Sequence, residues 1–164
     1  MKKAIFSGSF DPFTKGHLDI VERASKIFDE ILVAVCVNTA KAGGMFTPEE
    51  RVLIAEASLE SLKMETNCMI KSEICPDLLA DFAKSREISV IIRSARSASE
   101  FEYETMMAEV NRSLAGLETV IFPAAPELAH ISSTVARDMI LYGRPEIAIA
   151  DSAVETVKRL KNRK

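Results

Sequence analysis

The chain has 164 residues and a mass of 18.1 kDa, enough for one domain with its own hydrophobic core, which we expect over residues 1–164. With 48% hydrophobic and 27% charged residues, it is neither disordered, nor collagen-like, nor a small disulfide scaffold. The formal net charge of -3 argues against nucleic-acid binding through global charge, so any bound anion must be held by a local cluster.

Short apolar runs alternate with helical patterns along the chain. Residues 3–7 and 31–37 are apolar on both faces, which predicts buried strands. Residues 68–71 are a weaker third candidate, and residues 88–92 and 119–122 predict two more strands. Between them lie amphipathic helical segments, and a capping box marks helix starts at Thr47 and at Ser99. The tail from Asp151 to Lys164 predicts one more helix.

Strands separated by single helices indicate a doubly wound, Rossmann-like α/β domain. We expect a five-stranded parallel sheet with helices on both faces and a C-terminal helix. We interpret the cluster of Phe101, Met106 and Met107 as helix packing.

The composition also predicts where the protein works. No apolar run approaches the ~20 residues that span a bilayer, and the apolar start ends at Ser7, too early for a signal peptide. The cysteines Cys36, Cys68 and Cys75 are an odd count without metal-type spacing, which indicates reduced and partly buried thiols. We therefore expect a cytoplasmic protein that does not bind membranes.

In doubly wound sheets, ligands bind outside the carboxyl ends of the strands, and the loop after the first strand carries the strongest motif. Gly8 and Gly16 let the backbone approach a ligand closely, and Pro12 stiffens the turn between them. His17 falls in the first turn of the next helix, where the free amides and the dipole favour an anion. The alternative is a loop with a helix cap at Thr14 and a structural histidine.

A second motif opens a later helix. In residues 130–137, the hydroxyls of Ser132, Ser133 and Thr134 stand at a helix N-terminus, with Arg137 one turn further on. This arrangement predicts a binding site for an oligophosphate. The alternative is that Ser132-Ser133-Thr134 is only an ordinary helix cap. The cationic candidates on these loops are His17, Lys41, Arg93, Arg96 and Arg137. The alternative is that Lys41 and the three arginines are ordinary solvated charges.

Together the motifs resemble the nucleotidyltransferase superfamily, marked by Thr/His-x-Gly-His and Ile-Ser-Ser-Thr-x-x-Arg elements. The string from Gly8 to His17 resembles the phosphopantetheine adenylyltransferase family in particular, and segments such as Met45-Phe46-Thr47 and Phe101-Glu102-Tyr103-Glu104 extend the resemblance over nearly the whole chain. It implies transfer of the adenylyl group of ATP to 4′-phosphopantetheine, by in-line attack without a covalent intermediate, giving dephospho-coenzyme A and pyrophosphate. It also implies a homohexamer and feedback binding of coenzyme A. We expect Mg²⁺ to be carried by ATP, without a protein ligand.

The resemblance also implies roles for individual residues. His17 would stabilise the transition state, Ser9 would contact both substrates, Lys41 and Arg93 would hold the phosphate of phosphopantetheine, and Leu79 would line the groove for its arm. The residues implied in ATP binding are Ser9, Phe10, His17, Ser94, Ala95, Arg96, Glu104, Leu128, Ala129, His130, Ile131, Ser132, Ser133, Thr134 and Arg137. Apolar residues such as Met69, Ile70 and Phe101 are candidates for subunit interfaces.

The chain departs from the family pattern in two loops. Ser94 and Ala95 stand where the family usually has glycine and a larger apolar residue, and Ala42-Gly43-Gly44 replaces the usual lysine-proline after Lys41. An added side chain at position 94 predicts altered local backbone and weaker substrate binding.

Two other functions remain open. One is a related transferase acting on nicotinamide mononucleotide or glycerol phosphate. The other is a non-catalytic nucleotide- or coenzyme A-sensing module. A phosphorelay receiver is excluded because the acidic cluster and the phosphoacceptor aspartate at the strand ends are missing.

Overall fold

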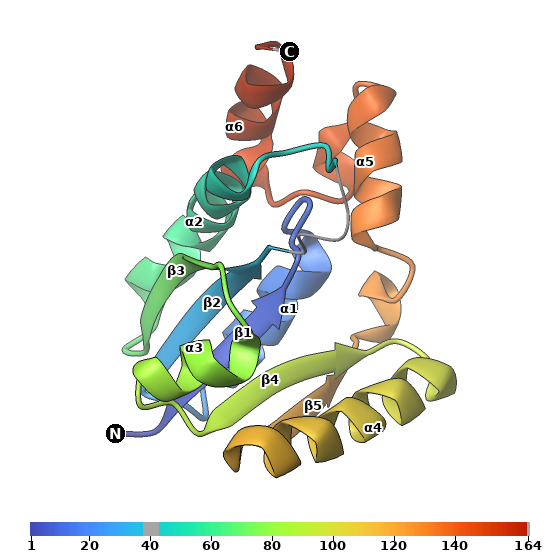
Figure 1. Cartoon of the computed structure of the whole chain (residues 1–164). Helices are drawn as coiled ribbons and strands as arrows, with labels where there is room; N and C mark the ends of the chain where they lie inside the picture. The colour runs from blue at the N-terminus through green and yellow to red at the C-terminus, as the bar shows by residue number, and fades with distance from the viewer. Residues whose placement is uncertain (38–42, 164) are drawn as a thin grey trace.

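The computed structural model describes residues 1–37 and 43–163, and within them the chain forms a five-stranded parallel sheet (Figure 1). The strands are β1 (Lys3–Gly8), β2 (Glu30–Cys36), β3 (Met69–Cys75), β4 (Val90–Ala95) and β5 (Glu118–Pro123). Their order in the sheet is β3-β2-β1-β4-β5, and each neighbouring pair is parallel. The winding direction therefore reverses between β1 and β4, which confirms the predicted doubly wound topology and locates the ligand-binding edge.

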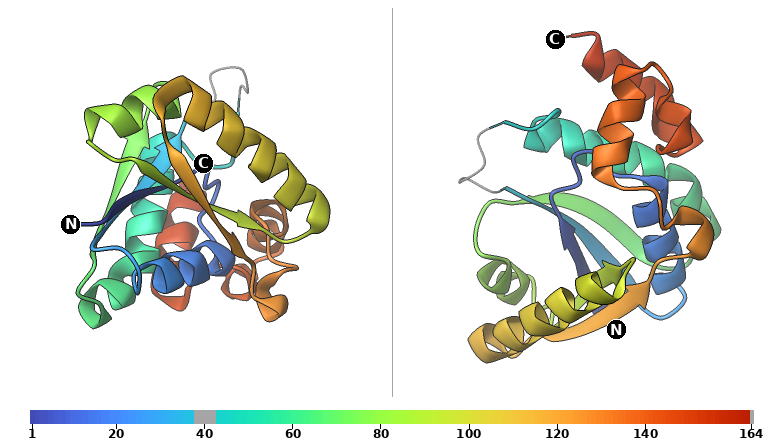
Figure 2. Two further views of the ribbon diagram at one scale, coloured as in Figure 1. Left: turned by 90° about the horizontal axis from the view of Figure 1, so that it is seen from below. Right: turned by 90° about the vertical axis from the view of Figure 1, so that its right-hand side faces the viewer.

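Helices cover both faces of the sheet (Figure 2). They are α1 (Lys15–Ala24), α2 (Pro48–Glu65), α3 (Leu79–Ser85), α4 (Ala98–Ala115), α5 (Ser133–Leu141) and α6 (Asp151–Lys161), with short 3₁₀ turns at Pro126–Leu128 and Pro145–Ile147. Phe6 of β1 belongs to the core beneath α1, α2 and α6, and its neighbour Ile5 belongs to the core beneath α3. Because successive side chains of a strand point to opposite faces, strands buried on both faces are apolar throughout.

The strand predictions differ from the structure at their ends. β3 runs to Cys75, beyond the predicted end at residue 71. The prediction stopped too early because Ser72 and Glu73 interrupt the apolar run, yet both residues pair with β2. β4 begins at Val90 rather than at residue 88 and continues to Ala95. Side chains at a sheet edge or beside a site are less apolar than those of central strands, so hydrophobicity marks the strand ends poorly.

One predicted helix start is confirmed and the other is wrong. Thr47 caps α2, and the Thr47 N–H donates to the Glu50 carboxylate at 2.8 Å, which completes the capping box. The cap of α4 is Ser97 rather than Ser99, and its hydroxyl accepts from the N–H of Glu100 at 3.2 Å. Residues 97–102 contain two overlapping Ser-x-x-Glu patterns, and the helix uses the earlier one, whose glutamate also reaches the Arg96 backbone.

The apolar residues of α4 do not pack as predicted. Of the predicted packing cluster, Phe101 and Met106 are each more than half exposed, whereas Met107 is partly buried. Ile70, which we considered for a subunit interface, is buried in the core, whereas Met69 beside it is exposed. The structure therefore leaves an apolar stripe on the outer side of α4.

The cysteines confirm the interpretation as free thiols. All three are unbridged, and Cys68 and Cys75 are buried. Burial raises the pKa of Cys75 to about 12, so its nucleophilic thiolate is suppressed at neutral pH. Across the described part of the chain, none of the helices combines the length and the apolar character that crossing a bilayer requires.

Candidate active site

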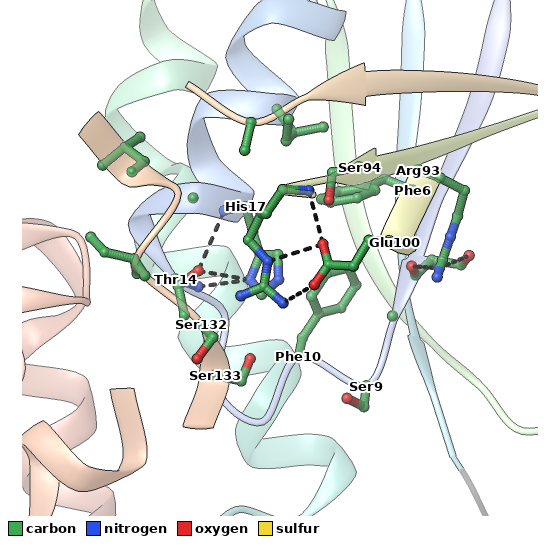
Figure 3. Close-up of a pocket in the computed structure, with 18 of the residues that line it drawn as sticks. Phe6, Ser9, Phe10, Thr14, His17, Arg93, Ser94, Glu100, Ser132 and Ser133 are labelled. Atoms are coloured by element: carbon green, nitrogen blue, oxygen red, sulfur yellow. Dashed lines mark hydrogen bonds and ion pairs between the residues drawn. The ribbon is translucent and has the colours of Figure 1, made fainter. Parts of the chain in front are cut away.

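A pocket of about 410 Å³ opens at the carboxyl ends of β1 and β4, where the winding reverses (Figure 3). Its walls come from the β1–α1 loop, the start of α1, the end of β4 with the start of α4, and the N-terminus of α5. The predicted site residues that line it are Ser9, Phe10, His17, Arg93, Ser94, Arg96, Glu104, Leu128, Ile131, Ser132, Ser133 and Thr134. The two motifs, more than a hundred residues apart in the sequence, thus meet in one cavity.

The β1–α1 loop folds back on itself to build one wall of the pocket. Phe10 has a left-handed backbone conformation, with φ of 43°, and its side chain is buried against Phe6 and Phe13. A Cβ at Gly8 would come within 2.9 Å of the Phe10 ring, so the fold-back of Phe10 requires glycine at position 8.

Asp11 fastens this loop to the segment before α2. Its carboxylate accepts from the N–H groups of Met45 at 3.0 Å and Phe46 at 2.9 Å, and it pairs with the Arg51 guanidinium at 3.4 Å. Arg51 also donates to the carbonyl of Ser9 at 3.3 Å. Sequence analysis gave Asp11 no role of its own, although it lies within the string from Gly8 to His17. The available signal was a carboxylate inside a buried, phenylalanine-rich turn, which needs donors around it.

A second set of contacts joins the same loop to α5. The Ser133 hydroxyl donates to the Pro12 carbonyl at 2.9 Å, and Arg137 donates to the Asp11 carbonyl at 2.7 Å. Arg137 also reaches the Thr134 hydroxyl at 3.1 Å and does not line the pocket. The guanidinium that we expected on phosphate therefore holds the two motifs together in this structure.

His17 lies in an aromatic cage and has a defined tautomer. Its ring centroid is 5.0 Å from that of Phe10, 5.3 Å from Phe13 and 6.1 Å from Phe6. The Thr14 N–H donates to Nδ1 at 3.0 Å as one half of the α1 capping box, so the proton of a neutral ring must sit on Nε2. Burial, and then the charges of Arg96 and Arg93, lower the His17 pKa from 6.5 to about 3. The pocket therefore contains a neutral imidazole whose free donor is Nε2–H.

We predict that the His17 imidazole stays neutral, with its proton on Nε2, from pH 8 down to pH 5. A lowered pKa means that the neutral form dominates at every pH above about 3. The measurement is the ¹⁵N chemical shift of both ring nitrogens across this pH range, assigned by comparison with His17→Asn, since His130 is the second of the two histidines. A titration step near pH 6.5 that disappears in His17→Asn would contradict the prediction.

The two arginines at the end of β4 are each paired with a glutamate of α4. Arg93 donates from Nε and Nη2 to Glu104 at 2.7 and 2.6 Å, and from Nη1 to the Ser7 carbonyl at 2.7 Å. Arg96 donates to Glu100 from its backbone N–H, Nε and Nη2 (Figure 3). Glu104, expected on polar groups of a nucleotide, is thus engaged by Arg93. Sequence analysis assigned Glu100 no place in the site: the capping box expected at Ser99 pairs that serine with Glu102 and leaves Glu100 without a role.

The remaining predicted residues lie around the pocket rather than in its wall. Leu79 begins α3 and packs, partly buried, against the core on that face. Ala95, Ala129 and the exposed His130 neighbour lining residues without lining the pocket themselves, and Lys41 lies outside the described residues. Ser94, the serine that replaces the usual glycine, pairs in register with Phe122 of β5, so β4 is a regular strand at this position.

No group of three or more histidine, cysteine, aspartate or glutamate side chains gathers as a metal cage within residues 1–37 and 43–163. The carboxylates that line the pocket, Glu100 and Glu104, are both engaged by arginines. Because these carboxylates are already paired, the groups of the pocket wall that can bind a ligand are mainly those that favour anions. They are the guanidinium groups, an imidazole N–H and the N-terminus of α5.

Comparison with known proteins places the chain in a family. A family model described as cytidylyltransferase-like matches residues 5–139. The chain is 43% identical to a phosphopantetheine adenylyltransferase of Frankia alni over 144 residues, 87% of each chain. It is 39% identical to the one from Streptomyces coelicolor over 166 residues, 99% of this chain and 100% of that one.

Structural similarity agrees on the fold. A putative nicotinate-nucleotide adenylyltransferase from Vibrio parahaemolyticus has a TM-score of 0.68 at 17% identity, with 97% of this chain and 93% of that one covered. At that identity the likeness concerns the fold alone, whereas the sequence relatives match along most of the length. The chain belongs to the phosphopantetheine adenylyltransferase family, within the cytidylyltransferase-like group.

Proposed function

We propose that the protein transfers the adenylyl group of ATP to 4′-phosphopantetheine, giving dephospho-coenzyme A and pyrophosphate. The observation that carries the proposal is the meeting of His17 and the hydroxyl-bearing N-terminus of α5 in one pocket. The bond from Ser133 to the Pro12 carbonyl holds these two elements together. Two polyanionic substrates need such a site, where cationic and N–H donors converge in an otherwise acidic chain.

The chemistry needs no protein nucleophile. A phosphate oxygen of phosphopantetheine forms a bond to the α-phosphorus of ATP, and the bond from that phosphorus to the β-phosphate bridging oxygen breaks, releasing pyrophosphate. Catalysis then consists of positioning and of stabilising charge on the transferring group. His17 suits this role because its Nε2–H is available to donate, and its burial beside arginines strengthens a hydrogen bond to a charged oxygen.

The remaining lining residues divide between the two substrates. The β- and γ-phosphates of ATP would lie on Ser132, Ser133 and Thr134, with Arg96 opposite, and Leu128 and Ile131 would provide apolar surface for adenine. Arg93 would hold the phosphate of phosphopantetheine, since Glu104 and the Ser7 carbonyl fix the orientation of its guanidinium. Ser9 and Phe10 lie between these two regions in the loop after β1.

Mg²⁺ would enter with the ATP phosphates, whose charge it neutralises. The donor set fits this form of binding better than a protein-held ion, because both carboxylates of the pocket wall already face arginines.

We also propose a cytoplasmic location, consistent with unbridged thiols, two of which are buried. The exposed apolar side chains Phe101, Met106 and Val110 of α4 support contact between subunits, and we propose that these form a homohexamer. Coenzyme A, which contains the product, would bind the same pocket as a feedback ligand.

The test is pyrophosphate release from Mg-ATP with a panel of phosphorylated acceptors. We expect turnover with 4′-phosphopantetheine and none of comparable rate with nicotinamide mononucleotide, nicotinate mononucleotide or glycerol 3-phosphate. Faster turnover with another acceptor would assign the protein to a different transferase activity. ATP binding without pyrophosphate release from any acceptor would instead identify a sensing module and contradict the proposal.

A further inference from the structure

The pocket wall contains two arginine–glutamate pairs of the same chemistry and different burial. Glu100 and Glu104 are one turn apart on α4, and their partners Arg96 and Arg93 lie at the end of β4. The Glu104 side chain is 10% exposed and that of Arg93 is 30%, while Arg96 and Glu100 are 38% and 37% exposed. The Arg93–Glu104 pair is therefore part of the packed wall of the pocket, whereas the Arg96–Glu100 pair is more exposed within it.

The Glu100 carboxylate occupies an anion-binding position. Three donors of Arg96 converge on it: the backbone N–H at 2.8 Å, Nε at 3.2 Å and Nη2 at 2.6 Å. A guanidinium fork combined with a backbone N–H is also the donor set that recognises phosphate. Hydrogen bonds from Arg96 lower the pKa of Glu100, so its carboxylate is charged at neutral pH.

The two pairs should respond differently to an incoming ligand. Arg93 is held additionally by the Ser7 carbonyl at 2.7 Å, and removing a partner from such a part-buried pair leaves a charge without compensation. Exposed pairs like that of Arg96 and Glu100 are weak and screened, so a phosphate group can replace the carboxylate. Glu100, Ser132 and Ser133 all line the pocket (Figure 3), and Arg96 lies near enough to His17 for its charge to lower the His17 pKa.

We infer that Glu100 is a specificity-determining residue of the nucleotide site, whose carboxylate holds Arg96 in the empty pocket and is displaced by the phosphates of the incoming nucleotide. The inference rests on the proposed function for the identity of the nucleotide. Every phosphate ligand must compete with this internal carboxylate. Ligands without phosphate gain nothing from Arg96, so Glu100 does not affect them.

The experiment compares Glu100→Gln with the unaltered protein in binding ATP, inorganic pyrophosphate and adenosine, by calorimetry or competition without any acceptor. Glutamine still accepts from the Arg96 N–H, so the start of α4 is preserved. We expect ATP and pyrophosphate to bind about two- to fivefold more tightly, the range that exposed ion pairs span, and adenosine to bind as before. Higher salt should shrink the difference.

Glu109→Gln is the matched control, because Glu109 also pairs with an arginine of α4, Arg112, and does not line the pocket. It should leave the binding of all three ligands unchanged. The inference is overturned if Glu100→Gln leaves ATP and pyrophosphate binding unchanged or weakens it, or if adenosine affinity shifts equally. Because these measurements contain no acceptor, a failure of pyrophosphate release with 4′-phosphopantetheine would count against the proposed function alone.

Discussion

Replacing His17 with alanine is expected to lower kcat for pyrophosphate release by about 100- to 1000-fold, the usual loss when one preorganised donor to a developing negative charge is removed. The affinity for ATP should change much less, because the Nε2–H bond strengthens mainly as charge accumulates on the transferring group. The measurement is steady-state kinetics with ATP and 4′-phosphopantetheine as varied substrates. The fold should persist, since the Thr14 hydroxyl caps the backbone N–H of residue 17 whatever its side chain.

His130→Ala is the control for this experiment. His130 is the second of the two histidines, it is exposed, and it does not line the pocket. Its replacement should leave kcat within a small factor of the original value. If His17→Ala retains most of the turnover while circular dichroism shows the native fold, His17 does not stabilise the transition state.

Replacing Asp11 with alanine should cost about 3–5 kcal/mol in the free energy of unfolding, the usual loss when one partner of a buried charged pair is removed. The change takes an acceptor from two backbone N–H groups and leaves the largely buried Arg51 without its carboxylate. For a chain of this length, we expect the Tm to fall by roughly 10 °C. Turnover should also fall, because the same contacts hold the loop that carries Ser9 and leads to His17.

Glu22→Ala provides the comparison for Asp11. Glu22 pairs with Lys26 four residues further on, and both side chains are more than half exposed. Removing an exposed pair should change the unfolding free energy by at most about 1 kcal/mol. Thermal or denaturant unfolding of the two variants side by side decides the matter: equal shifts would mean that the Asp11 contacts contribute no more than a surface pair.

The fold was predictable because each strand carries its own signal. Residues 31–37 are apolar at every position, which is typical of a strand buried on both faces, and the helices between such strands dictate parallel pairing. The start of α4 was not predictable, since Ser97 and Ser99 both head a Ser-x-x-Glu pattern. The choice between them depends on where β4 ends, which is set by its pairing with β5.

The pocket was predictable as a meeting of motifs, but not in its internal pairing. Loops at the carboxyl ends of parallel strands gather at one edge of the sheet, so the position of each motif just after a strand was enough to predict that His17 and Ser132 lie close together. Arg137 and Arg93 each bind a backbone carbonyl that is distant in the sequence and adjacent in space, that of Asp11 for Arg137 and that of Ser7 for Arg93. No local pattern encodes such contacts.

The close approach of Gly8 to the Phe10 ring limits how this part of the sequence can vary. Any side chain at position 8 would push the ring away and remove one wall of the cage around His17. A smaller residue at position 10 would make room for that side chain and would also leave a void beside the imidazole. Positions 8 and 10 therefore cannot vary independently. The effects of substitutions at the two positions on stability and turnover should be strongly non-additive, although neither residue takes part in bond making.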